Sequence, residues 1–173
     1  GALAVAEACR NISCVGGYPI ALSDCLNFGN PERPEVYYQL EECIKGMSEA
    51  CRVLDVPVVS GNVSLYNETG GQAVRPTPVV GGLGLLEDVN KRCSAGFRRS
   101  GDIVVLMGSS VLEDNCQSLA ASEFQEIFHG AVFGTLGLDL EFESRLQSLC
   151  REAISKGLLS SAHDCSDGGL AVT

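Results

Sequence analysis

The chain has 173 residues, a formal net charge of −10, and 45% hydrophobic and 20% charged residues. These values are typical of a globular protein with one large domain or two small ones. The acidic balance, without any block of Lys and Arg, argues against nucleic acid as a partner. No stretch has the roughly 18 apolar residues of a membrane span, so we expect no membrane partner either.

The two ends of the sequence indicate a segment of a longer polypeptide. Residues 1–8 already have a helical pattern, without a capping residue or an initiator Met. Residues 167–173 open a helix that stops at the last residue. No secretory signal is visible. We expect both ends to continue into sequence outside this chain.

Nine cysteines raise the question of disulfides or a metal site. Their number is odd and no C-x-x-C pair occurs. Cys43, Cys51 and Cys150 fall in apolar-periodic stretches, where a free thiol packs as a small hydrophobe. We therefore predict reduced, structural thiols in a cytoplasmic protein. Cys25 and Cys165 lie beside candidate site residues, but without an adjacent base a packing role is favoured over a nucleophile.

Helices and strands alternate in the first part of the chain. A helix is predicted from residue 1 to the Gly16-Gly17 pair, followed by a strand over Tyr18–Leu22 that leads into Ser23 and Asp24. Residues 27–34 form a turn-rich loop. The next helix has one apolar face, made of Val36, Leu40, Ile44, Met47, Cys51 and Leu54.

Short strands follow this helix. An apolar strand over Val56–Ser60 is predicted to break at Gly61 and Asn62 and to resume over residues 63–66. Residues 67–71 are predicted to form a hairpin turn, and residues 77–86 a strand with several glycines. The alternation indicates an α+β or mixed α/β architecture.

A polar stretch over residues 87–101 is predicted to link two domains, 1–95 and 96–173. The second domain is expected to begin with a buried strand at 102–107, followed by helices over 120–128 and 140–156. The apolar face predicted for the second of these helices is Phe142, Leu146, Leu149 and Ala153. A strand over 158–163 is then expected to lead residues 163–169 into a helix start.

Three segments share one pattern, in which an apolar strand is followed by acidic or amide side chains and glycine. They are residues 23–30, 60–68 and 163–169. Parallel strands present their carboxyl ends to a common crevice, and Mg²⁺ selects hard oxygen ligands. We therefore expect Asp24, Asn62 and Asp164 to converge on one metal–nucleotide site.

Each segment also has a purely structural interpretation. Asp24 is typical of an Asx-turn, and Asn62 after a glycine suits a left-handed turn. Ser166 or Asp167 is a suitable N-cap for a following helix. The occurrence of all three segments in one short chain favours the binding site.

Several well-known catalytic motifs are missing. The sequence contains no P-loop, no dinucleotide-binding fingerprint, no nucleophile elbow and no H-E-x-x-H pair. Of the two histidines, His163 is the better functional candidate because it lies at a predicted strand end, and His129 is expected to be structural. Nucleotide binding would therefore use another arrangement.

Four motifs, taken together, resemble one enzyme family. They are residues 24–32 (DCLNFGNPE), 61–68 (GNVSLYNE), 77–82 (TPVVGG) and 163–170 (HDCSDGGL). In this order they are similar to phosphoribosylformylglycinamidine synthase, in particular to the second half of its small-type synthetase subunit. The last motif is shared across the wider superfamily of aminoimidazole ribonucleotide synthetase.

The resemblance implies a fold and a reaction. The fold would be an aminoimidazole ribonucleotide synthetase N-terminal-like domain, with a mixed sheet that forms a barrel on dimerisation, followed by the start of an α/β/α domain. The reaction would join formylglycinamide ribonucleotide and glutamine-derived ammonia with ATP to give formylglycinamidine ribonucleotide, through a phosphorylated amide. Implied partners are the rest of the synthetase chain, a glutaminase subunit, a small bridging subunit and a second copy of the sheet domain.

The resemblance also implies roles for individual residues. Asp24, Gly61 and Ser166 would contact ATP, and Ser64 would contact the substrate. Asn62 and Asp164 would bind Mg²⁺. The sequence departs from the family at residues 120–124 (AASEF), where a Gly-Gly-Ser-Glu-Tyr run is usual, which weakens a phosphate contact there. The family's catalytic histidine and several metal carboxylates belong to its first half, so this chain alone is expected to be inactive.

Two other functions remain open at this stage. One is a nucleotide-holding half of the same enzyme without a catalytic role. The other is a different ATP-dependent member of the superfamily, such as a kinase or a selenophosphate-forming enzyme. The runs at 27–31 (NFGNP) and 64–68 (SLYNE) argue against this last possibility.

Overall fold

The computed structural model describes residues 1–108, 119–170 and 172–173. The chain forms two compact units. The larger unit contains residues 1–103 and 140–173, and the smaller one contains residues 104–139. Among the described residues, no helix combines the length and the apolar character needed to cross a membrane.

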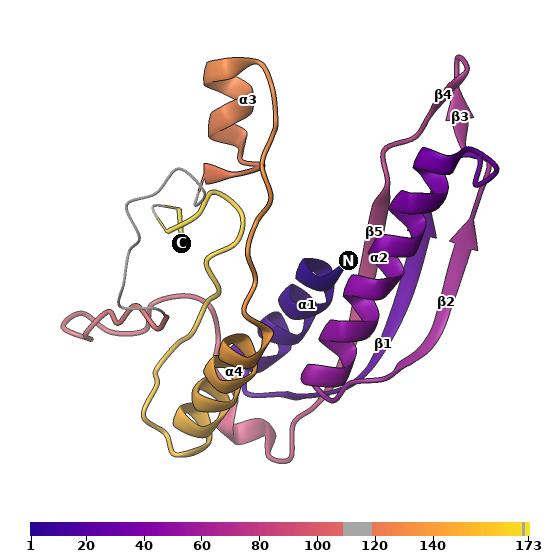
Figure 1. The fold of residues 1–173 in the computed structure, drawn as a ribbon. Helices are drawn as coiled ribbons and strands as arrows, with labels where there is room; N and C mark the ends of the chain where they lie inside the picture. The colour runs from indigo at the N-terminus through magenta and orange to yellow at the C-terminus, as the bar shows by residue number, and fades with distance from the viewer. Residues whose placement is uncertain (109–118, 171) are drawn as a thin grey trace. The chain divides into compact units, whose positions relative to one another are not determined.

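The larger unit is built on a three-stranded sheet in the order β2-β1-β5, covered on one face by helices (Figure 1). Helix α1 spans Ala2–Cys14, as predicted, and Gly16 follows it with a φ of 89°. Strand β1, Tyr18–Asn27, lies in the centre of the sheet. It is parallel to β2, Val58–Ser64, and antiparallel to β5, Thr77–Leu85.

The two strands beside the candidate site continue through positions where the sequence predicted an end or a break. The predicted end of β1 at Leu22 is wrong, because pairing with both neighbours continues as far as Asn27. The predicted break in β2 at Gly61 and Asn62 is also wrong, since both residues pair with β1 in register. A glycine and an asparagine are poor strand formers by propensity, but the ladder to a central strand overrides that preference.

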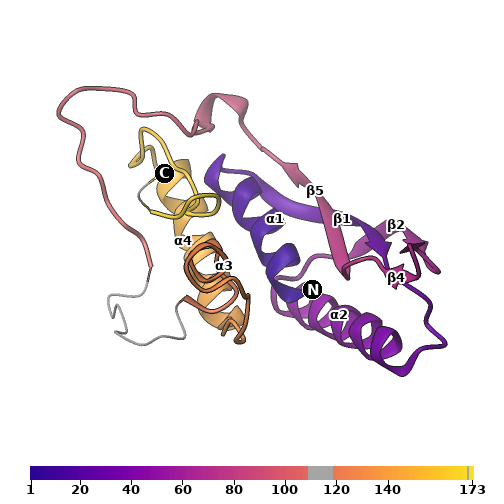
Figure 2. The same cartoon turned by 90° about the horizontal axis from the view of Figure 1, so that it is seen from above.

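Helix α2, Pro34–Val53, connects the two parallel strands and packs on the same face of the sheet as α1 (Figure 2). Its start at Pro34 uses the fixed φ of proline at the first helical position. The helix was predicted, but its buried face consists of Val36, Cys43, Met47 and Ala50. Ile44, expected in that face, is 44% exposed. The core beneath the helices includes the fully buried side chains of Val5, Cys9, Leu22 and Phe28.

Two glycines in β5 let helix α1 lie directly on the sheet. A side chain at Gly82 would begin 2.7 Å from the Cδ1 atom of Ile12, and one at Gly84 would overlap the Cγ2 atom of the same residue. The predicted hairpin is confirmed, with β3 at Glu68–Thr69 and β4 at Gln72–Ala73. Gly70 and Gly71 form its turn with positive φ.

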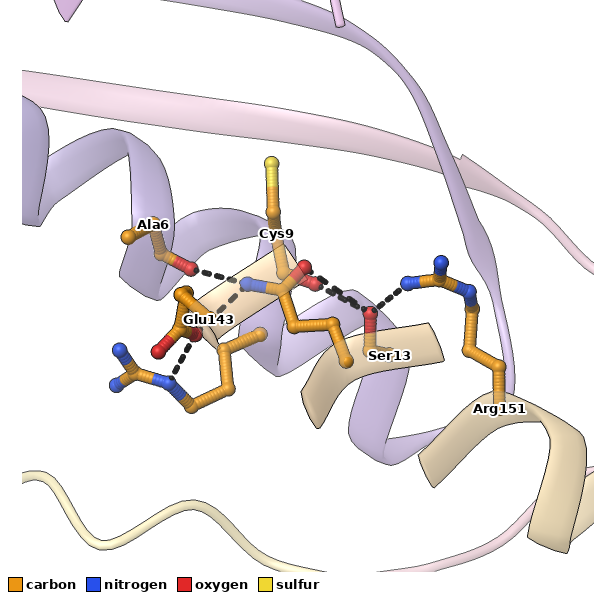
Figure 3. A network of polar contacts seen from close by, with 7 residues as sticks. Ala6, Cys9, Ser13, Glu143 and Arg151 are labelled. Atoms are coloured by element: carbon orange, nitrogen blue, oxygen red, sulfur yellow. Dashed lines mark hydrogen bonds and ion pairs between the residues drawn. The ribbon is translucent and has the colours of Figure 1, made fainter. Parts of the chain in front are cut away.

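Helix α4, Leu140–Ser155, docks on α1 through polar side chains (Figure 3). The Gln147 Nε2 atom donates to the Ala6 carbonyl oxygen at 3.1 Å and to Glu143 Oε1 at 2.8 Å. Arg10 Nε donates to the same carboxylate oxygen at 2.8 Å. The apolar face predicted for this helix is therefore wrong: its buried residues are Leu140, Glu143, Gln147 and Ile154, whereas Leu149 is 55% exposed.

Three elements predicted in the second domain are not formed. Residues 102–107 and 158–163 contain no strand, and residues 164–170 form turns instead of a helix start. Ile103 is 88% exposed and Leu158 is 72% exposed. Neither segment has a partner strand within the described part of the chain, and a strand without a partner has unpaired backbone groups. A 3₁₀ turn, η1 at Val89–Lys91, lies in the predicted linker.

The smaller unit contains one described helix, α3, at Glu123–His129. Ser122 caps it by accepting a hydrogen bond from the Gln125 backbone N–H, and Gly130 ends it in a left-handed conformation with a φ of 64°. The helix was predicted to begin at residue 120. It begins three residues later because Ser122, with an extended backbone, is its N-cap.

Candidate nucleotide site

Asp24 and Gly61 lie opposite each other on neighbouring parallel strands. The Asp24 carboxylate occupies the space where a side chain at position 61 would lie, so only glycine fits there. Asp24 also lines a cavity of about 390 Å³ between the sheet and α2, whose other walls include Met47, Ser48 and Arg52. Two residues predicted to contact ATP are thus neighbours.

The opposite face of the same two strands carries a polar stripe, which we define as six residues in three cross-strand pairs. The pairs are Ser23 with Ser60, Cys25 with Asn62, and Asn27 with Ser64. The Ser60 hydroxyl donates to the Ser23 hydroxyl oxygen at 2.9 Å. Because side chains alternate along a strand, the stripe faces away from Asp24. Asn62 is exposed and offers an amide oxygen and two amide protons.

The end of the polar stripe is tied to the next loop by Asn67. Its Nδ2 atom donates to the carbonyl oxygen of Phe28 at 3.1 Å and to that of Ser64 at 2.9 Å. The Ser64 hydroxyl donates to Asn67 Oδ1 at 3.2 Å. Tyr66 adopts a φ of 60°, which turns the chain so that this contact forms. Asn67 therefore holds Ser64 in place and is not an open ligand.

We expect Asn67→Ala to lower the free energy of unfolding by about 1–2 kcal/mol, because the partly buried hydrogen bonds of its side chain to Phe28 and Ser64 are lost. The loss is limited, since the two carbonyl oxygens keep the bonds from the backbone N–H groups of Phe28 and Asn67. Chemical denaturation measures the change. Asn90→Ala, which removes an exposed amide bonded to Asp88, is the matched control and should shift stability by less than about 0.5 kcal/mol. Equal effects of the two substitutions would contradict this role.

Glu68, the other oxygen-bearing residue at the end of this stretch, is also engaged. Its carboxylate pairs with the Arg33 guanidinium at 3.2 Å, which links the hairpin to the start of α2. No local sequence pattern indicates this pair, because 35 positions separate the two residues.

Asp164 lies beside helix α1, apart from the other predicted ligands. With its amide oriented to donate, Asn11 hydrogen-bonds the two carboxylate oxygens of Asp164 at 3.1 and 3.0 Å. The His163 Nδ1 atom lies 2.6 Å from the Asp164 carbonyl oxygen. The Ser166 carbonyl oxygen accepts from the Gly169 N–H, which closes a turn. Within the described residues, no contact joins Asp164 to Asp24 or Asn62.

The donor chemistry fits Mg²⁺ only in part. In residues 1–108, 119–170 and 172–173, no three His, Cys, Asp or Glu side chains lie close enough to hold a metal ion. The polar stripe supplies neutral oxygens and no carboxylate. Neutral oxygens of this kind fit a Mg²⁺ ion that is already coordinated by the phosphate groups of a bound nucleotide. Asn62 would then supply one further oxygen to the ion.

Sequence comparisons assign the chain to a family. The N-terminal domain of AIR synthase related proteins matches residues 1–86, and their C-terminal domain matches residues 99–173. The chain belongs to the AIR synthase related family. The predicted fold class, with a mixed sheet and helices, is confirmed. The family's two domains meet between residues 86 and 99, where η1 lies.

Members of the family with curated names cover the whole chain. The phosphoribosylformylglycinamidine synthase subunit PurL of Moorella thermoacetica is 56% identical over 173 residues, which are 99% of this chain and 23% of that protein. The PurL subunit of Thermomicrobium roseum is 56% identical over 170 residues, 98% of this chain and 22% of the relative. The chain thus spans less than a quarter of the length of the curated relatives that it matches.

A solved structure of a family member is similar over part of the chain. Thermotoga maritima PurL, solved in complex with AMPPCP, has 38% sequence identity and a TM-score of 0.49. The aligned region covers 53% of this chain and 16% of that one.

Proposed function

We propose that this chain is part of an ATP-dependent ligase that forms a C–N bond, phosphoribosylformylglycinamidine synthase, and that it contributes one side of the nucleotide and substrate site. The names of the relatives that match 98–99% of the chain support this proposal. The structural observation that carries it is the partly exposed polar stripe, which ends at a Ser64 held by Asn67. A row of fixed hydroxyl and amide groups suits a phosphorylated, hydroxyl-rich ligand.

In the proposed reaction, ATP phosphorylates the amide oxygen of formylglycinamide ribonucleotide and ammonia from glutamine displaces the phosphate. Asp24 and Gly61 would position the nucleotide together with Ser166, and Ser64 would contact the ribonucleotide. Mg²⁺, with Asn62 and Asp164 among its ligands, would neutralise phosphate charge. Asp164 contacts α1 in this chain, and Asp24 faces away from the polar stripe that carries Asn62 and Ser64. The part of both aspartates in one site would therefore require the rest of the enzyme.

The proposal includes partners and a compartment. The outer face of β5 carries Val79, Leu83 and Leu85, which are 55%, 60% and 55% exposed. An apolar row next to the polar stripe suits contact with a second, equivalent sheet, as expected from the resemblance. The rest of the synthetase chain, a glutaminase subunit and a bridging subunit would complete the enzyme in the cytoplasm. By itself the chain would be inactive.

We expect Asn62→Ala to lower the turnover of the complete enzyme at least tenfold, because it removes a ligand to the charged phosphate-bound ion. Steady-state assays with saturating ATP measure this. The substitution lies on an exposed position of β2, so the thermal midpoint should not change. Asn90→Ala, at an exposed position of η1, is the control and should leave turnover unchanged.

Two results would count against this assignment. Full turnover of Asn62→Ala with a lower thermal midpoint would indicate that this half of the enzyme binds a nucleotide for structural stability and has no catalytic role. Full turnover with an unchanged midpoint would remove Asn62 from the site altogether.

A further inference from the structure

A row of three polar side chains crosses the sheet at the end of the polar stripe. Asn27 on β1 pairs with Ser64 on β2 and with Thr77 on β5. The row therefore takes one residue from each strand of the sheet. Because neighbouring strands lie about 4.8 Å apart, it extends for about 10 Å across the strand direction. The polar surface is thus wider than the β1–β2 pairs of the polar stripe.

The row lies on the face of the sheet that α1 and α2 leave uncovered (Figure 2). On β5, Gly82 lies against Ile12 of α1, so it marks the covered face. Thr77 is five positions away along the strand and lies on the other face. On β1, the buried Leu26 marks the covered face, and Asn27 follows it directly. A ligand can therefore reach Thr77, which is exposed, and Asn27, which is half-buried.

Hydrogen bonds within the protein leave the two hydroxyl oxygens of the row as acceptors. The Thr77 hydroxyl donates its proton to the carbonyl oxygen of Arg75 at 3.0 Å. The Ser64 hydroxyl donates its proton to Asn67 Oδ1 at 3.2 Å, and its oxygen accepts from Asn67 Nδ2 at 3.1 Å. Among the described residues, no group donates to Thr77 Oγ1, and one lone pair of Ser64 Oγ stays open. Both ends of the row can accept a hydrogen bond.

Asn27, in the middle of the row, offers both kinds of group. Its Nδ2 atom makes one long contact, 3.5 Å to the Cys25 sulfur atom, which leaves its second N–H as a donor. Within residues 1–108, 119–170 and 172–173, no group donates to its Oδ1 atom. The row is uncharged and has more acceptors than donors. It is complementary to hydroxyl groups, which donate and accept, and not to a phosphate group, whose oxygens accept.

We propose that this row binds the ribose of the ribonucleotide substrate, with Asn27 and Thr77 as binding residues beside Ser64. The inference rests on the proposed function, which supplies the ribonucleotide and its contact with Ser64. The two ribose hydroxyl groups donate to oxygens of the row, and Asn27 Nδ2 donates to one of them. The phosphate group lies outside the row. A ligand without these hydroxyl groups leaves polar groups of the row unpaired, so the row selects a ribonucleotide over a deoxyribonucleotide.

Thr77→Val in the complete enzyme that carries this sequence tests the inference, because valine keeps the branched shape and removes the acceptor. We expect the KM for formylglycinamide ribonucleotide to rise about 3- to 10-fold, the effect of one lost hydrogen bond, while the KM for ATP stays the same. Thr77→Ser, which retains the hydroxyl, should recover most of this loss. Thr69→Val, at an exposed position of β3, is the matched control and should change neither constant.

Substrate analogues that lack one ribose hydroxyl group identify the part of the ligand that the row contacts. The 2′-deoxy and 3′-deoxy forms of formylglycinamide ribonucleotide should each have a higher KM with the unaltered enzyme. With at least one of them, Thr77→Val should cause no further rise, because the hydrogen bond is already absent. Asn27→Ala should behave in the same way. If Thr77→Val raises the KM equally for all three ligands, the row does not bind the ribose and the inference is wrong.

Ser64→Ala separates this inference from the proposed function. A higher KM for the ribonucleotide in Ser64→Ala, with no change in Thr77→Val and Asn27→Ala, would overturn the inference alone. A complete enzyme that does not turn over formylglycinamide ribonucleotide would overturn the proposed function, and the inference with it.

Discussion

Replacing Gly61 with alanine is expected to lower the free energy of unfolding by about 1–3 kcal/mol, the range typical of added volume in a packed site. The new Cβ atom would overlap the Asp24 carboxylate, which lies across the β1–β2 pairing. Either the carboxylate moves or the strands separate. Since we propose that Asp24 contacts the nucleotide, the same change in the complete enzyme should also raise the KM for ATP. Thermal denaturation and ATP titration measure the two effects.

Two further variants test the cause of this effect. Gly96→Ala adds the same methyl group where no atom lies within 4 Å, so it should leave stability and the KM unchanged. Asp24→Ala removes the two side-chain atoms that lie nearest to the new Cβ. The double variant Asp24→Ala/Gly61→Ala should therefore lose less free energy of unfolding than the sum of the losses of the two single variants. Strict additivity would show that the carboxylate is not what excludes a side chain at position 61.

Arg10→Ala is expected to lower the free energy of unfolding by about 2–4 kcal/mol. Its partner Glu143 has a side chain that is only 8% exposed, and without Arg10 its charge is left with the Gln147 amide as a partner. A buried charge that loses its partner is strongly destabilising, and the 25% exposure of Arg10 reduces the loss. Urea denaturation, followed by helical circular dichroism, measures it.

The Lys156–Glu152 ion pair provides the control. Both side chains are about 60% exposed, so Lys156→Ala should give no measurable change. In Arg10→Ala/Glu143→Gln the buried charge itself is gone, and part of the lost stability should return. If Arg10→Ala and Lys156→Ala have the same effect, the polar contact between α1 and α4 does not stabilise the larger unit.

Periodicity predicted the elements whose burial depends on apolar side chains. Helices α1 and α2 and strand β5 were found within about two residues of their ends, since their apolar residues recur at the spacing of a helix or a strand. Helix α4 was found as well, but not its packed face. The side chains of Glu143 and Gln147 are buried because they bond to α1, more than 130 positions away, and no local pattern encodes such a partner.

The candidate site could likewise be predicted only where a local sequence pattern indicates it. The segments that contain Asp24 and Gly61 were recognised from their polar residues after an apolar run, and parallel pairing brought these two residues together. Side chains alternate along a strand, so Asn62 lies on the face opposite Asp24 once Gly61 pairs with Asp24. The sequence prediction placed a strand break at Gly61 and therefore missed this alternation. The contact of Asp164 with Asn11 depends on the packing of a loop on α1, and the sequence carries no signal for it.

The central position of β1 has a consequence for synthesis on the ribosome. Both of its partner strands come later in the chain, and about thirty residues separate its end from the start of β2. At about 5–20 residues per second, β1 is without a partner strand for roughly 2–6 s. Helix α1 precedes β1 in the chain, packs against it, and is the first element able to cover it. The nascent chain is therefore expected to bury β1 against a helix before any sheet exists.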